Sequence, residues 1–301
     1  MTAPFDLTDD SVVVIIGTGA GGGVLANELA QKGVSVVALE AGGRYLPDDY
    51  INDEWDSFGQ LAWLDGRTTS GDWRVANDFS GLPAWIVKAV GGTTTHWAGA
   101  SLRFQDHEWK AKTNYGAVAG ANLLDWPIDG AEMAPYYDKA EKKLNVTRTN
   151  GNAGLPRNNN YKVFEAGAKE LGYEEVHTGR MAINSAPTED RMACQQTGFC
   201  FQGCKWGAKW SSAYTDIPAG EATGNLEVRE KAHVLKIEHD ATGKVTGVVY
   251  VDADGNQQMQ KARIVCVAGN SIESPRLLLN SASSRGPGGR ANSSGQVGRH
   301  D

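Results

Sequence analysis

The feature that most constrains the fold is a glycine-rich turn between two apolar runs near the N-terminus. Residues 12–16 are a continuous apolar run, residues 22–31 have the period of a helix, and residues 34–40 form a second apolar run. Continuous β-branched runs are typical of buried parallel strands, which need a crossover connection such as a helix. The sequence therefore predicts a strand–helix–strand unit and an α/β protein with a Rossmann-like fold.

The turn carries the spacing Gly17-x-Gly19-x-x-Gly22. In such a turn the first glycine permits the tight bend, the second lets the backbone approach a pyrophosphate, and the third lets helix and strand pack closely. Glu40 ends the second run, where a carboxylate can accept hydrogen bonds from a ribose 2′-hydroxyl. This pattern predicts a dinucleotide site for FAD or NAD rather than NADP. The alternative is a glycine-rich turn in an unrelated sheet.

The C-terminal third has the pattern of short strands separated by turns. The turns are Thr242-Gly243-Lys244 and Asp254-Gly255-Asn256, which have residues suited to tight connections. We expect these strands to form a β-meander, with the last strand buried in the first sheet. The predicted strands are residues 226–230, 233–239, 245–251, 257–262 and 264–268.

Three further helices are expected from helix-start signals and apolar spacing. Pro135 is predicted to open a helix that runs through Leu144, and residues 164–171 have the pattern of another helix. Ser274 and Pro275 are predicted as the N-cap and first residue of a helix through Asn280. Residues 147–160 are poor in apolar side chains and are expected to be a loop.

Charge and hydropathy argue against a nucleic-acid partner and against a transmembrane helix in this chain. The chain has 29 Lys and Arg against 36 Asp and Glu, a net charge of −7, whereas a nucleic-acid-binding protein needs a basic surface. No apolar run approaches the roughly 18–20 residues of a transmembrane helix. The N-terminal segment MTAPFDLTDD has no apolar stretch, so we expect no secretory signal there.

Three of the four cysteines lie close together, as Cys194-x5-Cys200-x3-Cys204. Such clustering suits a metal site better than a disulfide framework, because thiolates are soft ligands that bind iron–sulfur clusters or zinc. Zinc and free thiols both remain open on spacing alone. Cys266 lies inside an apolar run and is expected to be a buried structural cysteine.

Four segments resemble, in order, the glucose-methanol-choline (GMC) oxidoreductases, a family that binds FAD. They are GTGAGGGVLANELAQKGVSVVALEAG, AVGGTTTHWAG, DWPIDGAEMAPYYDKAE and AGNSIESPRLLLNS. The chain departs from the family at Asn270 in the last segment and at Ala282 just after it, where smaller or glycine residues are usual. The resemblance runs from Val12 to about Arg299. It implies a GMC-type FAD-binding fold with an inserted meander and irregular segments.

The resemblance also implies roles for individual residues. Gly92 and Thr93 would belong to a second flavin loop, and the backbone of Val234 would meet the adenine. The sequence Thr95-His96-Trp97 is similar to the loop of pyranose 2-oxidase, in which the histidine is bonded to the flavin. His96 is therefore a candidate for a covalent link to FAD. The alternative is a histidine that only hydrogen-bonds within a loop near the ring.

The cysteine spacing resembles the large subunits of bacterial membrane-associated FAD dehydrogenases that act on glucose, fructose, sorbitol or gluconate. That resemblance implies a [3Fe–4S] cluster on Cys194, Cys200 and Cys204. It further implies hydride transfer from a sugar, polyol or sugar acid to flavin N5, then electron transfer through the cluster. The implied partners are a small escort subunit and a cytochrome c subunit that leads to quinone. The implied location is the periplasmic face of the inner membrane, with a cytoplasmic location as the alternative.

The family's catalytic base is a histidine far towards the C-terminus, and none of the six histidines matches it. We therefore expect a substrate domain beyond this chain, and poor turnover by the chain alone. The expected division is a first FAD-binding part (residues 1–110), an inserted segment with the cysteines (111–215) and a second FAD-binding part (216–301). The alternatives are a GMC oxidase that uses oxygen without a cluster, and a nucleotide-binding module without chemistry. The histidines are His96, His107, His177, His233, His239 and His300.

Overall fold

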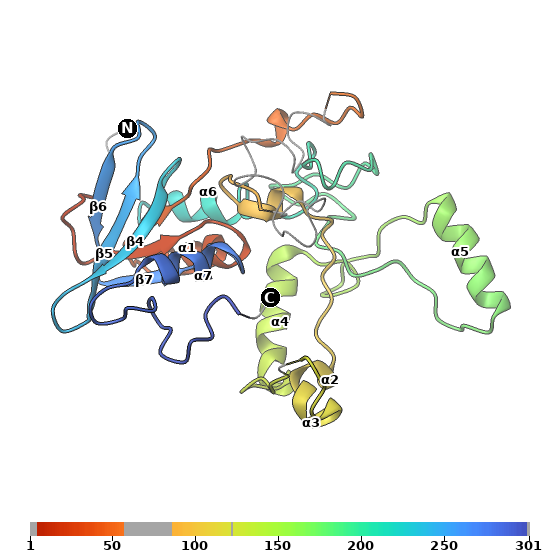
Figure 1. Ribbon diagram of the computed structural model, residues 1–301. Coiled ribbons are helices and arrows are strands. Elements are labelled where there is room, and N and C mark those ends of the chain that lie inside the picture. Colours follow the sequence, from red (N-terminus) through yellow and green to blue (C-terminus); the bar gives the residue numbers. More distant parts are fainter. Residues whose placement is uncertain (1–4, 57–85, 122, 300–301) are drawn as a thin grey trace. The chain divides into compact units, whose positions relative to one another are not determined.

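The computed structural model describes residues 5–56, 86–121 and 123–299 of the 301-residue chain (Figure 1). The chain forms two compact units. The first comprises Met1–Trp97, Gly198–Gly207 and Ser211–Asp301, and the second comprises Ala98–Thr197 and Ala208–Trp210. Each unit is therefore assembled from segments that are distant in the sequence.

A four-stranded parallel sheet lies at the centre of the first unit. Its strand order is β3 (Leu226–Arg229), β2 (Val36–Leu39), β1 (Val13–Ile16) and β7 (Ile264–Val267). The predicted strand–helix–strand unit is confirmed, with α1 (Ala20–Ala30) between β1 and β2. The fold is the predicted α/β, Rossmann-like fold.

The side chains of β1 alternate between two hydrophobic cores. Val13 and Ile15 pack in one core with Ala26 of α1 and Ile217 of α6 (Asp216–Glu221). Val14 and Ile16 pack in the other with side chains of β4, β5 and α7. Because both faces are covered, every residue of β1 is buried, which explains the uninterrupted apolar run in the sequence.

The second sheet is antiparallel and contains β4 (His233–His239), β5 (Val245–Val251) and β6 (Gln257–Lys261) in that order (Figure 1). Both predicted turns are confirmed. Gly243 and Gly255 have φ angles of +95° and +83°, a left-handed conformation that glycine adopts without strain. In each turn the carboxylate of the preceding Asp240 or Asp252 accepts backbone N–H groups.

The prediction that residues 226–230 belong to the meander is wrong. Residues 226–229 form β3, which pairs in parallel with β2, so that Leu226 lies beside Val36. The last strand joins the first sheet as predicted, because β7 pairs with β1. The prediction that this strand is buried is wrong, because Ile264 is 50% exposed and the other three residues of β7 are half-buried. A short apolar run does not reveal its neighbours. The helix α6 that precedes β3 packs on α1 and returns the chain in the parallel direction.

The predicted helix starts are also wrong, although the C-terminal ends agree within one residue. Helix α4 (Gly130–Leu144) begins five residues before Pro135, because the side chain of Asp129 accepts the N–H of Glu132. Helix α5 (Asn159–Glu170) begins before residue 164, since Asn158 caps it.

Helix α7 (Glu273–Asn280) begins one residue before Ser274, because the side chain of Asn270 accepts the N–H groups of Ile272 and Glu273. Ser274 is therefore not the N-cap. Its hydroxyl instead accepts the N–H of Gly269.

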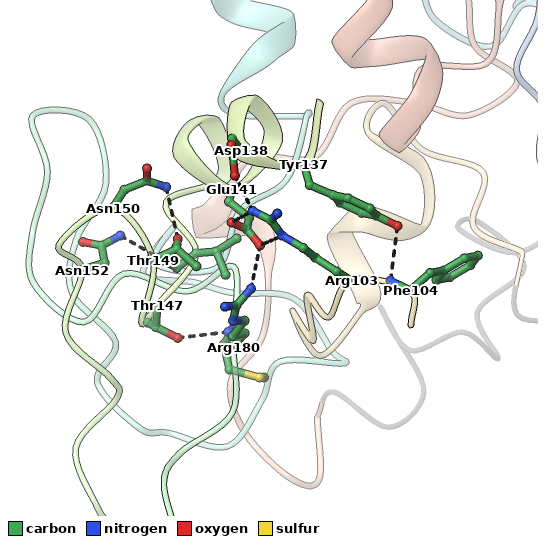
Figure 2. Close-up of polar contacts among 12 residues, drawn as sticks. Arg103, Phe104, Tyr137, Asp138, Glu141, Thr147, Thr149, Asn150, Asn152 and Arg180 are labelled. Carbon is green, nitrogen blue, oxygen red and sulfur yellow. Dashed lines mark hydrogen bonds and ion pairs between the residues drawn. The ribbon is translucent and has the colours of Figure 1, made fainter. Parts of the chain in front are cut away.

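The second unit contains α2 (Asp106–Trp109), α3 (Ala111–Tyr115), α4 and α5. Its ionic centre is the carboxylate of Glu141 on α4, which is 7% exposed. Figure 2 shows the guanidinium groups of Arg103 and Arg180 directed at this carboxylate. Arg103 also contacts Asp138, one turn earlier on α4. In the described part of the chain, no helix is both long and apolar enough to cross a membrane.

Candidate functional site

The turn after β1 is packed so closely that side chains are excluded at two of its glycines. Gly17 has a φ of +91°, and a Cβ there would lie 2.6 Å from the carbonyl oxygen of Ala268 in the β7 segment. A Cβ at Gly22 would lie 2.0 Å from the carbonyl oxygen of Gly17. At Gly19 the nearest heavy atom to such a Cβ is the Cα of Gly92, 4.0 Å away. The first and third glycines therefore serve packing, whereas the second leaves space.

A cavity of about 310 Å³ opens beside this turn, within the first unit. It lies where the carboxyl ends of β1, β2 and β7 meet, the usual position of a ligand in an open α/β sheet. Among the described residues that line it are six of the eight predicted to bind the cofactor; Gly22 and His96 do not line it. The six are Gly17, Gly19, Glu40, Gly92, Thr93 and Val234.

Glu40 supplies a buried carboxylate to the cavity. The residue is 6% exposed. Its Oε2 accepts the N–H of Thr18 at 3.0 Å and the hydroxyl of Thr18 at 2.7 Å, and its Oε1 accepts the N–H of Gly42 at 3.0 Å. Burial raises the pKa of Glu40, and the hydrogen bonds from Thr18 and Gly42 oppose that rise. The donors hold the carboxyl group in one orientation at the end of β2.

The start of β4 and the residue before it form a second wall, through Ala232, His233 and Val234. The N–H of Ala232 donates to the carbonyl of Glu40 at 2.7 Å, which fixes this segment to the end of β2. His233 is half-buried, and its Nε2 lies 3.4 Å from Nη2 of Arg276. Burial and then the charges of Lys88 and Arg276 lower the pKa of His233.

Sequence reasoning did not assign Lys88, His233 or Arg276 to the site, although all three line the cavity. Arg276 lies within the SPRLL part of a segment that resembles the family, and that resemblance could have pointed to it. No sequence pattern points to Lys88, because it joins the cavity wall only through tertiary folding.

The Gly/Thr loop approaches the first turn directly. It forms the short helix η3 (Gly92–His96). Gly91 and Gly92 have φ angles of +92° and +52°, and a Cβ at Gly92 would lie 3.0 Å from the Cα of Gly19. Two motifs that are 73 residues apart in the sequence are therefore in backbone contact.

His96 lies at the end of this loop and is 1% exposed. Its Nδ1 is 2.7 Å from the hydroxyl oxygen of Thr95, and that hydroxyl donates to the carbonyl of Gly92 at 2.8 Å. A hydroxyl has one proton, so both contacts are satisfied when Nδ1 carries the hydrogen. The ring of Tyr50 packs edge-on to the imidazole, with centroids 6.1 Å apart.

The three clustered cysteines are divided between the units. Cys194 belongs to the second unit, whereas Cys200 and Cys204 belong to the first, and all three are half-buried. Three thiols suit a soft metal or an iron–sulfur cluster chemically. Within the described residues, however, no group of three or more His, Cys, Asp or Glu side chains is placed to hold a metal ion. Cys266 is half-buried in β7 rather than buried, and its burial raises the pKa of its thiol.

Comparison with known proteins gives a consistent result. The family model described as GMC oxidoreductase matches residues 14–299. The chain is 30% identical to the fructose dehydrogenase large subunit of Gluconobacter japonicus, over 96% of this chain and 57% of that protein. It is 34% identical to paromamine 6'-oxidase of Streptomyces fradiae, over 97% and 53%, and 24% identical to the gluconate 2-dehydrogenase flavoprotein of Pantoea cypripedii, over 88% and 51%.

Solved structures agree on the fold. Pyridoxine 4-oxidase from Mesorbium loti superposes with a TM-score of 0.60 at 17% identity, covering 91% of this chain and 52% of that one. The chain therefore spans about half the length of the proteins that it matches.

Proposed function

The chain belongs to the GMC oxidoreductase family, and on that premise we propose that it is the FAD-binding part of an enzyme that oxidises a CH–OH group. The observation that carries the proposal is the cavity at the carboxyl ends of β1, β2 and β7, with a glycine turn on one side and a buried carboxylate on another. When bound, FAD supplies a ring that accepts a hydride from an alcohol carbon.

The residues of this chain bind and orient the cofactor in this proposal. The first N–H groups of α1 would face the pyrophosphate, where the positive end of the helix dipole favours an anion. The carboxylate of Glu40 would accept a ribose hydroxyl, and the backbone at Val234 would meet the adenine. Gly92 and Thr93 would face the flavin. No residue of this chain is assigned as the base that takes the hydroxyl proton.

The proposed substrate is a sugar, a polyol or a sugar acid. The names of two relatives specify fructose and gluconate, and the chain matches both over most of its length. A module that binds the dinucleotide without performing chemistry is the competing reading. It predicts FAD binding without reduction of the flavin by any sugar, even when the chain is part of a longer polypeptide.

Flavin content is the direct test of the proposal. We expect the purified chain, refolded or expressed with excess FAD, to be yellow and to retain about one flavin per chain after desalting. A colourless protein that also fails to quench FAD fluorescence would contradict the proposal. Reduction of the bound flavin by fructose or gluconate, in a polypeptide extended to the length of the relatives, tests the substrate class.

We further propose that His96 is the attachment point if the flavin is covalent. The support is its position at the end of the Gly/Thr loop and the resemblance of Thr95-His96-Trp97. Acid precipitation should leave the flavin with the wild-type protein and release it from His96→Ala. Complete release from the wild type would establish the alternative, a histidine that only hydrogen-bonds within a loop near the ring.

The proposal extends to the route by which electrons leave the flavin. The cysteine spacing and the match to a dehydrogenase large subunit support a [3Fe–4S] cluster on Cys194, Cys200 and Cys204, with a cytochrome c partner and an escort subunit. The corresponding location is the periplasmic face of the inner membrane, and a cytoplasmic location is the alternative.

Iron and sulfide analysis with electron paramagnetic resonance tests the cluster. Iron-fed, anaerobically purified protein should contain both elements, Cys204→Ser should lose them, and Cys266→Ser should keep them. Wild-type protein without iron but with reducible flavin and oxygen consumption would favour the oxidase alternative.

A further inference from the structure

Four residues of the first unit close a ring of hydrogen bonds next to the cavity. The N–H of Gly91 donates to the hydroxyl of Thr18 at 3.1 Å, and the hydroxyl of Thr94 donates to the carbonyl of Gly91 at 2.5 Å. The N–H of Ser212 donates to the hydroxyl of Thr94 at 3.3 Å, and the hydroxyl of Ser212 donates to the carbonyl of Thr18 at 2.9 Å. The ring joins the first turn, the Gly/Thr loop and the segment before α6.

The ring is shielded from water. Thr18 and Ser212 are fully buried, and Thr94 is 6% exposed. Hydrogen bonds in such surroundings have no competing water, and a partner left unsatisfied there is costly. The relative positions of the three segments therefore depend on these hydroxyl groups.

Thr18 is the ring member that also bonds Glu40. Its hydroxyl donates its one proton to Oε2 of Glu40 at 2.7 Å, so it must act as the acceptor for the N–H of Gly91. One oxygen atom thereby links the carboxylate at the end of β2 to the turn at Gly91 and Gly92. That turn is in contact with Gly19, on another side of the same cavity.

We propose that Thr18 is a positioning residue for the dinucleotide, whose hydroxyl sets the separation between the ribose-binding carboxylate and the loop beside the phosphate turn. This inference rests on the proposed function, because it takes the cavity as the FAD site. A dinucleotide engages both places at once, so a shift of either one lowers its affinity. Loss of the hydroxyl removes a donor from Glu40 and an acceptor from Gly91 together.

The test compares ligand affinity in Thr18→Val, which has nearly the same shape without a hydroxyl, and Thr18→Ser, which keeps it. The probes are FAD and ADP; ADP contains the ribose and the pyrophosphate but no ring that a histidine could bond. By titration calorimetry, Thr18→Val should weaken the binding of both probes by about tenfold or more, the loss expected for one hydrogen bond to a charged group. Thr18→Ser should stay within about threefold of the wild type.

Thr223→Val is the matched control, because the Thr223 hydroxyl also donates one hydrogen bond and accepts another, at the end of α6 and outside the ring. It should leave both affinities unchanged. A second control, Val13→Ala, opens a cavity in the core of the same sheet; it should lower the melting temperature of the ligand-free chain without weakening binding. A general loss of stability is thereby separated from a loss of positioning.

Ser212→Ala breaks the ring at a residue that itself neither bonds Glu40 nor lines the cavity, and it serves if Thr18→Val does not fold. It should weaken ADP binding measurably, and the double variant should lose less than the product of the single losses, since both act through one ring. Equal affinities in the wild type, Thr18→Val and Ser212→Ala would overturn the inference while leaving the FAD site intact. Failure of the wild type to bind either probe would instead overturn the proposed function.

Discussion

At the scale of single residues, neighbouring glycines of the first turn differ in whether the structure has space for a side chain. Gly21 and Gly22 are neighbours in the first turn of α1. A Cβ at Gly22 would lie 2.0 Å from a carbonyl oxygen, whereas a Cβ at Gly21 would have nothing within 4 Å. The motif spacing marks Gly22 as essential, and the structure supplies the reason, which is steric.

Gly22→Ala should therefore destabilise the ligand-free chain by about 2 kcal/mol or more, as expected for a residue forced into a packed site. Gly21→Ala is the control and should be neutral or stabilising by up to about 1 kcal/mol, because alanine favours a helix. Urea unfolding followed by circular dichroism measures both. Equal stability of the two variants would contradict the steric explanation.

Glu40 is a second residue whose effect follows from its contacts. In Glu40→Gln the amide would present an NH₂ group where the carboxylate now accepts hydrogen bonds from Thr18 and Gly42. We expect FAD affinity to fall by about tenfold, since the ribose also loses a charged acceptor. Fluorescence titration with FAD measures this change. Unchanged affinity would show that the carboxylate only supports the fold.

At the scale of elements, helix α4 is fixed within the second unit by ion pairs. Oε1 of Glu141 accepts Nε of Arg103 at 2.8 Å and Nη1 of Arg180 at 2.9 Å. Figure 2 shows both arginines meeting this one carboxylate. Hydrogen bonds from Arg103 lower the pKa of Glu141 below its ordinary value of 4.5. Glu141, the buried residue of α4, therefore fixes the helix by charge.

This depressed pKa sets the direction of an acid effect. A carboxyl group with a lowered pKa in the folded state contributes stability above about pH 4.5, and that contribution is lost as the pH falls through the folded value. Glu141→Gln should cost about 1–3 kcal/mol at neutral pH and should flatten the acid limb of the stability curve. Asp138→Asn is the control, because the Asp138 side chain is 69% exposed, and it should cost less than about 1 kcal/mol. An unchanged acid limb in Glu141→Gln would contradict this assignment.

At the scale of the whole molecule, the chain is divided into two units, and the candidate cavity belongs entirely to the first. The two hydrophobic cores around the parallel sheet also belong to that unit. Neither of these two cores includes a described residue of the second unit, in which Arg103 and Arg180 form ion pairs with Glu141.

Calorimetry of the chain should therefore show two thermal transitions. FAD should raise the midpoint temperature of one of them. A ligand at a hundred times its dissociation constant adds about 2.7 kcal/mol to the unit that binds it. The other transition should stay in place. A single transition that shifts as a whole would show that the units unfold cooperatively.

The sequence allowed most elements of the fold to be predicted, and six of the eight residues predicted to bind the cofactor line the cavity. Strands β1 and β2 were recognisable because burial on both faces requires uninterrupted apolar residues, and β7 was recognisable because all four of its residues are apolar. The helix starts were missed because side chains of Asp129 and Asn270 satisfy the first N–H groups ahead of the more conspicuous proline signals. The place of β3 was missed because a four-residue strand has the same pattern in either sheet.

The sequence alone determined the dinucleotide turn, its carboxylate Glu40 and the order of the family motifs, because each depends on residues that are close together in the chain. Only the tertiary structure decided which distant residues meet. It placed Lys88 and Arg276 on the cavity wall and Ser212 in a ring with Thr18. It also divided Cys194 from Cys200 and Cys204 between two units. The physical reason is that a hydrogen bond between segments 194 residues apart leaves no periodicity or spacing in the sequence.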